Sequence, residues 1–573
     1  MKKTMFLGWA LLAVAGHAQV VLNTDTLVHT YTLPVMCPGT TSQALVECQN
    51  HNNSTLYGAG SIMPETDLNP GKGVYYVRLT DAATLRASKS YHPDPSGGAN
   101  DNIFDATNTR LVITEEGNVQ IVLSLDPNPS SPTYLKTQKL YGANHYVNTT
   151  TAWFSKIPPT QGNGNPTVSL FYDLEMVKVN GVIHPFIKSY DFSSTTTAPS
   201  GKTIVDLDTA PNCLGTTFNA TFNGILTASD DDQTFSTTVS NLGGQDTACY
   251  AVVYNRSKGC RVLNTCTQQV SGNWGAKGST DDTTNNGSPA LYYIHNVTMT
   301  HDGSNVLISS QIPNSCISAQ SGGTCGQYFA FFVWENGLSY PANPAPTGLH
   351  IGSRDSGDNC GHQTSGYSHI VNKCMRSNGD GAFTIFERQV YPSTNLRPTG
   401  GAPILNPGWT SGAYCYITSS SFVCPSDDTH ISWNNAVSGN DTEPIYGTNF
   451  VQSSIYANGP IPDVPTWFWD NEVFRISPSC WVNGNLTSCA GNTLTNIAHT
   501  YSDSNPANAA GFFDYQAVGS VSARSSYGQH FYAFTSNWQG QLGCTDGTYT
   551  TPCPTVSGHP SMRFDAFLVA VPD

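Results

Sequence analysis

The fold is decided by a stretch near the C-terminus, Ser520–Gly543, which reads SVSARSSYGQHFYAFTSNWQGQLG. Small polar residues lead to a turn at Tyr527–Gly528, and the apolar content then peaks at Phe531–Phe534. Apolar side chains occupy both alternating positions there, so both faces of a strand would be covered. The stretch therefore predicts a turn followed by a strand that is buried on both faces.

The same order of strand, Asp/Gly/Asn-rich turn and strand recurs upstream. It is found in FDATNTRLVITEEG (Phe104–Gly117), LTASDDDQTFSTTVS (Leu226–Ser240) and HNVTMTHDGSNVLISS (His295–Ser310). We expect the Asp residues of HDGS and SDDD to form turns, and the same of DDTH (Asp427–His430). Repetition of one hairpin theme predicts a β-propeller, because a single four-stranded blade cannot bury both of its faces alone.

These hairpins resemble the S-x-D-G-x-x-[IL]-x-F-x-S blade motif of TolB-like propellers. The match is clear over Ser520–Ser536 and over His295–Ser310. The adjoining TSNWQGQLG, Thr535–Gly543, is similar to the last blade of large secreted bacterial propeller proteins. The resemblance covers two blades, and it implies a fold rather than a reaction.

Composition favours an all-β chain. The 573 residues include 52 Gly and 35 Pro, only 11% are charged, and long amphipathic helical patterns are missing. We expect an N-terminal arm over residues 19–68 and one propeller of seven blades over 69–573. Seven blades would average about 79 residues, above the roughly 40–45 of a compact blade, so the surplus is expected in long, disulfide-stapled loops. Asp565–Pro572 is the expected C-terminal strand that closes the ring.

The first 18 residues, MKKTMFLGWALLAVAGHA, have two lysines, a short apolar stretch and small residues before Gln19. This pattern predicts a cleaved secretory signal, and the apolar stretch is shorter than the about 20 residues of a membrane span. We therefore expect a secreted, periplasmic or cell-surface protein, and a monomer. The net charge of −15 becomes −17 after cleavage, with 23 basic against 40 acidic residues. Such an acidic chain argues against nucleic acid and anionic lipid as partners.

Sixteen cysteines in an exported chain predict disulfides. They are Cys37, Cys48, Cys213, Cys249, Cys260, Cys266, Cys316, Cys325, Cys360, Cys374, Cys415, Cys424, Cys480, Cys489, Cys544 and Cys553. Four neighbouring pairs are separated by the same nine positions, which favours pairing between neighbours along the whole chain. Thiolate zinc sites would favour C-x-x-C knuckles, and the sequence has none.

Histidines are the candidates for a polar centre. Three fall within twenty positions, and two more belong to later hairpins: His350, His362, His369, His430 and His499. In a propeller, residues from different blades meet around the axis, so these imidazoles could hold one divalent metal ion or form an acid/base centre. Asp355, Asp358 or Gln363 could orient such ligands. The alternative is that each histidine bonds to a neighbouring blade.

Two function classes remain open. Serine-hydrolase, H-E-x-x-H, P-loop and Rossmann motifs are missing, which disfavours those enzymes. One class is a binding or scaffold module for extracellular glycan or protein; Trp467 and Trp469 could stack on a sugar, although interblade core is the alternative. The other is a metal-assisted polysaccharide lyase or hydrolase with a histidine-lined channel, an outline similar to oligogalacturonate lyase. We prefer the binding module, because no catalytic signature is strong.

Overall fold

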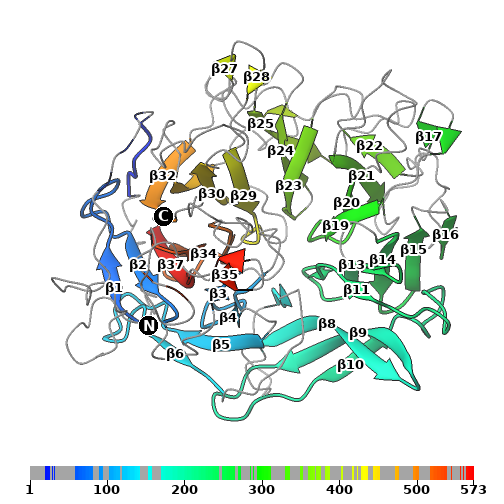
Figure 1. Cartoon of the computed structure of the whole chain (residues 1–573). Coiled ribbons are helices and arrows are strands. Elements are labelled where there is room, and N and C mark those ends of the chain that lie inside the picture. The colour runs from blue at the N-terminus through cyan, green and yellow to red at the C-terminus, as the bar shows by residue number, and fades with distance from the viewer. Residues whose placement is uncertain are drawn as a thin grey trace, which may run out of the picture.

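The computed structural model contains β-strands and no helix among the residues that it describes (Figure 1). It describes residues 20–573 with internal gaps, the longest being 32–58, 142–152, 158–168, 273–283, 312–328, 336–348, 388–401, 404–415, 452–470, 477–493, 503–516 and 545–554. Within the described part, no helix is long and apolar enough to cross a membrane. Several predictions fall on residues outside this part: the signal peptide (1–18), Trp467, Trp469, Cys37, Cys48, Cys266, Cys316, Cys325, Cys415, Cys424, Cys480, Cys489 and Cys553.

Seven antiparallel sheets of four or more strands are described, and we number them sheet 1 to sheet 7. Sheet 1 joins both ends of the chain through β1 (Ile62–Pro64), β2 (Tyr75–Arg78), β33 (Gly519–Val521), β34 (Gln529–Ser536) and β37 (Asp565–Pro572). Sheet 2 contains β3 (Tyr91–His92), β4 (Arg110–Glu115), β5 (Val119–Leu125) and β6 (Thr137–Lys139). Sheet 3 contains β7 (Trp153–Phe154), β8 (Leu170–Val179), β9 (Val182–Asp191) and β10 (Lys202–Asp206).

The remaining sheets follow in chain order. Sheet 4 contains β11 (Phe222–Asn223), β12 (Thr227–Ala228), β13 (Thr234–Ser240), β14 (Tyr250–Asn255), β15 (Gly259–Asn264) and β16 (Gln269–Ser271). Sheet 5 contains β19 (Tyr293–Met299), β20 (Asn305–Gln311), β21 (Phe329–Glu335) and β22 (Leu349–Gly352). Sheet 6 contains β23 (Asn359–Ser365), β24 (His369–Met375), β25 (Gly381–Glu387) and β26 (Ala402–Pro403). Sheet 7 contains β29 (Asp427–Ser432), β30 (Ile445–Val451), β31 (Glu472–Ile476) and β32 (Leu494–His499).

Short hairpins accompany these sheets. They are β17 (Thr284–Asn285) with β18 (Ser288–Pro289), β27 (Tyr416–Ile417) with β28 (Phe422–Val423), and β35 (Thr555–Val556) with β36 (His559–Pro560).

The sheets follow one another around a ring (Figure 1). A backbone bridge joins Asn102, beside sheet 2, to Trp153 of sheet 3. The later neighbours pack through β8 and β11, β13 and β19, β19 and β23, β23 and β29, and β29 and β33, and β3 packs on β34. The all-β propeller prediction is therefore confirmed. The number of seven blades stays a prediction, because the residues between the sheets are only partly described.

Sheet 1 closes the ring by pairing strands from the two ends of the chain. β37 spans the predicted closing strand and lies between β34 and the N-terminal β2. Tyr75 pairs with Ala570 and Arg78 with Phe567. This pairing removes a free edge from each terminal segment, as expected for a closed propeller. β1, from the predicted N-terminal arm, adds the outermost strand of the same sheet.

Alternation along β34 and β37 fills two apolar clusters. Phe531 and Ala533 of β34 pack toward sheets 2 and 3, whereas Tyr532 and Phe534 pack toward sheet 7. In β37, Leu568 lies in the first cluster, whereas the adjacent Phe567 and Val569 lie in the second. The predicted strand buried on both faces is thus confirmed, because every residue of β34 is buried.

The four recurring phrases form the predicted hairpins. Asp302 caps the turn between β19 and β20 by accepting a hydrogen bond from Ser304 N at 2.9 Å. Asp231 caps the turn between β12 and β13 by accepting one from Gln233 N at 3.0 Å. The expectation for DDTH is wrong: Asp427–His430 lies within β29, paired to β30, because strand pairing there supersedes the local turn preference.

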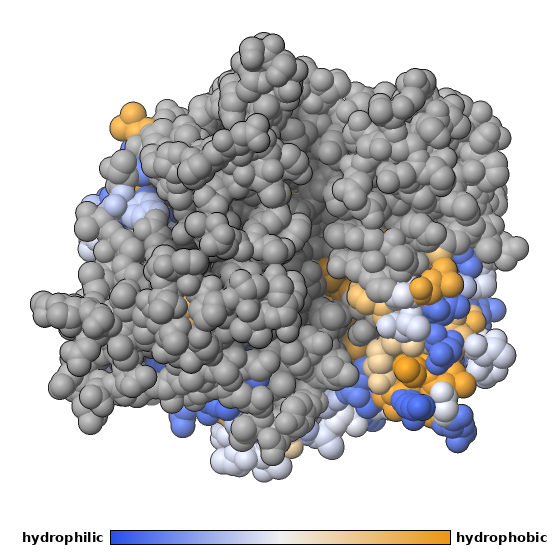
Figure 2. Space-filling model, in the orientation of Figure 1, coloured by the Kyte–Doolittle hydropathy of each residue, from blue (hydrophilic) through white to orange (hydrophobic). Residues whose placement is uncertain are grey.

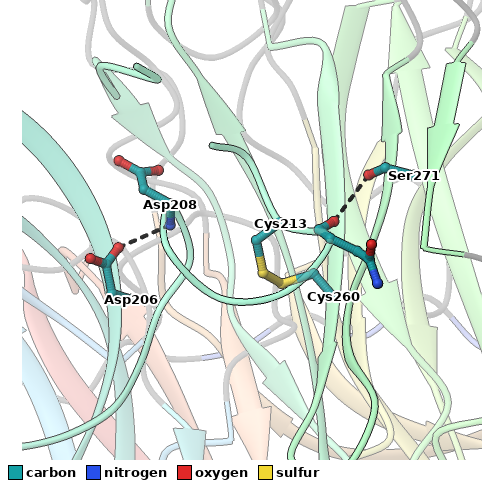
Figure 3. The surroundings of a disulfide bond; sticks show 6 residues. Asp206, Asp208, Cys213, Cys260 and Ser271 are labelled. Carbon is teal, nitrogen blue, oxygen red and sulfur yellow. Dashed lines mark hydrogen bonds between the residues drawn. A yellow bond between two sulfur atoms is a disulfide. The ribbon is translucent and has the colours of Figure 1, made fainter. Parts of the chain in front are cut away.

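The disulfides do not all join neighbours in sequence. Cys213 pairs with Cys260, at a Cα–Cα distance of 4.9 Å, so the predicted pairs 213/249 and 260/266 are wrong (Figure 3). The reason is spatial, since the loop after β10 of sheet 3 lies against β15 of sheet 4, where Cys260 N donates to Pro211 O. Cys249 and Cys544 are also disulfide-bonded. Cys360 and Cys374 lie opposite each other in β23 and β24, a register that suits the predicted pairing.

Asn23, Asp25 and His29, near the N-terminus, lie against the outer strands of sheet 7. Asn23 forms a backbone bridge with Asn496 of β32, and Leu22 is buried in the cluster between sheets 7 and 1. His29 bonds through Nδ1 to Glu472 Oε1 and through Nε2 to Asp25 Oδ1, both at 2.9 Å. This N-terminal segment therefore covers the otherwise unpaired edge of β32.

We expect attachment of this segment to weaken as the pH rises above about 6.5. The hydrogen bond that His29 donates to Glu472, with the nearby charges of Glu472 and Asp25, raises the pKa of His29. A raised folded-state pKa means that the stabilisation is complete below the unfolded value and is lost as pH rises through the folded one. The facing His499 is neutral throughout, since burial lowers its pKa to about 3.

The measurement is the rate of limited proteolysis within residues 20–31 at pH 5.5 and pH 8.5. A charge-assisted hydrogen bond contributes about 1.5–3 kcal/mol. We therefore expect the cleavage rate of the wild type to rise from pH 5.5 to pH 8.5 by a factor at least about ten times larger than that of the His29→Gln variant. The variant at each pH corrects for the protease's own pH dependence. Equal acceleration in both proteins would contradict the role of His29.

Candidate functional site

Backbone hydrogen bonds link the turns that follow the first strands of neighbouring sheets. Asp230 N donates to His301 O at 2.7 Å, His301 N to Gly366 O at 2.9 Å, and Asp302 N to Tyr367 O at 2.8 Å. These turns belong to sheets 4, 5 and 6, whose first strands contact one another. They bring polar side chains of different sheets together near the ring axis. We call the group Lys156, Asp230 and His301 the axial cluster.

Lys156, which follows β7 of sheet 3, reaches the other members of this cluster. Its Nζ lies 2.9 Å from His301 Nδ1 and 4.0 Å from Asp230 Oδ1. It also donates to the carbonyl oxygen of Ala436, beyond β29 of sheet 7, at 3.3 Å. His301 Nδ1 lies 2.8 Å from the same oxygen. Groups from sheets 3, 4, 5 and 7 therefore converge at one point.

The axial cluster is buried and electrostatically balanced. The side chains of Lys156 and His301 are 6% and 1% exposed. Burial, followed by the Lys156 charge, holds the pKa of His301 well below its usual value, so the imidazole is neutral. Burial raises the pKa of Asp230 to about 7, against the opposing effect of Lys156. Trp153 adds an aromatic wall, with Lys156 Nζ 5.7 Å from its ring centroid.

This arrangement is suited to joining sheets rather than to chemistry. A general base must reach the proton that it removes, and the side chains of Asp230, Lys156 and His301 are only 13%, 6% and 1% exposed. Lys156 is engaged with an imidazole and a carbonyl, which leaves it poorly placed as a nucleophile. We conclude that the axial cluster holds sheets 3, 4, 5 and 7 together at the point where they meet.

The predicted histidine centre is only partly described. His350, His362 and His369 lie in β22, β23 and β24, and their side chains are outside the described part. His430 and His499 are both buried, but they lie in the first and last strands of sheet 7, with β30 and β31 between them. At about 4.8 Å per strand these two are roughly 14 Å apart, so the structure does not bring them together. Whether His350, His362 and His369 form a metal centre, with or without one of these two, stays a prediction.

Sequence reasoning missed a different group of metal-type ligands. Among the described residues, His184, Asp206 and Asp208 of sheet 3 are the group with metal-ligand geometry, each offering an atom within 4.8 Å of the others. Burial raises the pKa of Asp208 to about 7. The signal in the sequence was D-L-D at the end of a strand that follows a histidine-containing strand.

Comparisons with known proteins show likeness in outline only. No family model matches the chain, and no curated protein matches its sequence. Similar solved structures include Porphyromonas gingivalis dipeptidyl peptidase 4 (9% identity, TM-score 0.28, 76% of this chain and 56% of that one). Others are the tricorn protease (10%, 0.32, 80% and 36%) and Drosophila Semaphorin 1b, extracellular domains 1-2 (9%, 0.31, 87% and 86%).

The chain spans about half or less of the length of the two peptidase chains. TM-scores of this size carry no argument about activity, and the fold assignment rests on the strand topology above. Membership of the TolB-like group stays a prediction.

Proposed function

We propose that this protein is a secreted propeller that acts as a binding module for an extracellular protein or glycan. The observation that carries the proposal is an exposed apolar surface on the outer half of the β8–β9 hairpin. The side chains of the axial cluster, by contrast, are at most 13% exposed and contact one another, which supports binding over catalysis at that site.

The hairpin extends outward because its turn is strongly specified. Asn180 and Gly181 both have positive φ, 51° and 91°, and Val179 pairs directly with Val182. This is the Asn-Gly two-residue turn of a tight hairpin, and it lets β8 and β9 continue for ten residues each. In β8 the inner half is largely buried, whereas the outer half, which leads to the turn, is half-buried or exposed.

Apolar residues gather on this outer half. Val179 is 37% exposed, and Val177 and Val182 are half-buried. Figure 2 shows hydrophobic residues collected over the region of sheets 3 and 4. We call Val177, Val179 and Val182, which the strand register places on one face of the hairpin, the hairpin patch.

The hairpin patch suits a protein partner better than a sugar. Its members are aliphatic, whereas sugar recognition typically uses aromatic faces. Contiguous exposed apolar residues on a soluble protein mark interaction surfaces. A charged residue in the centre of such a surface weakens binding strongly because it would be desolvated.

We expect Val179→Asp to weaken binding at least about tenfold without changing the fold, because the side chain is exposed. The full chain would be applied to arrays of extracellular proteins and of glycans, and the affinity for each positive would be measured. Tyr527→Asp is the matched control, since Tyr527 is similarly exposed but lies in the turn between β33 and β34 of sheet 1.

Two outcomes would contradict the proposal. Binding that is equally affected by both variants would remove the hairpin patch as the contact surface. Release of unsaturated product at 235 nm or of reducing ends from a polysaccharide panel would replace the binding module with the enzyme alternative.

A further inference from the structure

We propose that His184, Asp206 and Asp208 form a binding site for one divalent transition-metal cation of the Zn²⁺ or Mn²⁺ type. This inference is independent of the binding function proposed above. It rests on the mutual distances of the ligand atoms, on a buried carboxylate without a hydrogen-bond donor among the described residues, and on the bonds that hold the loop after β10 in place.

The distances fit a coordination sphere. His184 Nδ1 lies 3.2 Å from Asp206 Oδ2 and 3.3 Å from Asp208 Oδ2. Ligands bound at about 2.1 Å are separated by roughly 3.0 Å in octahedral and 3.4 Å in tetrahedral geometry. The same nitrogen therefore faces both carboxylates at the spacing that a shared cation would impose. One N–H could serve only one of them well as a donor.

Asp208 is the observation that points to a missing charge partner. Its side chain is 0% exposed, and neither carboxylate oxygen has a hydrogen-bond partner among the described residues. Buried carboxylates are normally paired, hydrogen-bonded or bound to a metal. Its Oδ2 lies 3.3 Å from His184 Nδ1, so the unsatisfied carboxylate faces the other two members of the group.

The loop that carries the aspartates is held in place. Asp206 Oδ1 accepts from Asp208 N at 2.9 Å, and Leu207 N donates to Pro185 O at 3.0 Å, next to His184. The Cys213–Cys260 disulfide fastens the end of the same loop to sheet 4 (Figure 3). The ligands therefore need little rearrangement to bind an ion, which favours affinity.

The donor set indicates the class of ion. An imidazole suits Zn²⁺ and related ions, and carboxylates also suit Mn²⁺, whereas Ca²⁺ and Mg²⁺ favour all-oxygen sites. Three protein ligands leave positions for water. Asp206 and His184 keep 19% and 10% of their side chains exposed, so an ion can reach them.

The test uses the full chain, dialysed against chelator and then titrated separately with Zn²⁺, Mn²⁺ and Ca²⁺. We expect about one equivalent of Zn²⁺ or Mn²⁺ by elemental analysis and a rise in melting temperature on binding. Asp206→Asn and His184→Gln should each lower affinity at least about tenfold and reduce the melting response. Asp191→Asn, at the end of the same β9, is the control and should respond as the wild type does.

Asp208→Asn separates metal binding from folding. It removes the buried charge, so the metal-free variant should fold at least as well as the wild type and yet lose the metal response. The proposal is overturned if the wild type binds less than about a tenth of an equivalent of each ion, or if the three ligand variants bind as Asp191→Asn does. In that case the group is an ion-pair network between His184 and the aspartates.

Discussion

Replacing Asp565 with Ala should lower the free energy of unfolding by about 3–5 kcal/mol, because it would leave buried cations without their carboxylate. Asp565 begins β37, and its side chain is fully buried with that of Arg78 from β2. Its Oδ2 accepts from Arg78 Nη2, and its Oδ1 accepts from Arg563 Nη2 at 2.8 Å and from Thr80 Oγ1 at 3.0 Å. One carboxylate thus joins the two ends of the chain.

The measurement is the urea unfolding midpoint with the disulfides intact. Arg524→Ala is a control from the same sheet, since Arg524 pairs with Asp573 but its side chain is 56% exposed. An exposed pair contributes about 0–1 kcal/mol, so this variant should change little. Asp565→Asn keeps an acceptor and should lie between the two. If Asp565→Ala shifts the midpoint no more than Arg524→Ala does, the carboxylate is not what holds the ring closed.

The strands and turns were predictable because their signals are local. The alternation of apolar residues at Phe531–Phe534 identifies β34, and the HDGS turn identifies the hairpin at β19 and β20. The prediction that Asp565–Pro572 closes the ring followed from the general need of a propeller to leave no sheet edge unpaired. These properties depend on neighbours within about ten residues, or on a rule that applies to every propeller.

The site residues were less predictable because they meet through the tertiary fold. Cys213 pairs with Cys260 across two sheets, although Cys249 is nearer to both in the sequence. His184 and Asp208 are joined by the register of β9 and β10, which the sequence does not specify. Lys156 and Ala436 meet although 280 positions separate them. The sequence shows which residue types could form bonds or bind metal, but it does not show which of them lie side by side in the fold.

Replacing Lys156 with Met should destabilise the protein by up to about 1.4 kcal/mol more at pH 8 than at pH 5. Lys156 is the cation that lies beside the Asp230 carboxylate, whose oxygens have no hydrogen-bond partner among the described residues. Methionine keeps most of the contact with Trp153 but removes the charge. The buried carboxylate would then be costly wherever it is ionised.

The pH dependence follows from the direction of the shift. Burial already raises the pKa of Asp230 to about 7, and losing Lys156 would raise it further. A carboxyl with a raised folded-state pKa contributes its full stability below the unfolded value, about 4, and loses it as pH rises through the folded value. The difference between wild type and variant should therefore grow from pH 5 to pH 8. His301, also facing the carboxylate at 3.9 Å, would gain basicity once the lysine charge is gone and would offset part of the loss.

A double variant isolates the charge effect. Adding Asp230→Asn to Lys156→Met should recover most of the lost stability at pH 8, because no ionised group would remain without its cation. Urea midpoints of the four proteins at pH 5 and pH 8 give the coupling between the two residues. A loss that is the same at both pH values and is not recovered in the double variant would mean that Lys156 acts through its contacts with Ala436 and Trp153, and that the axial cluster is held by packing rather than by charge.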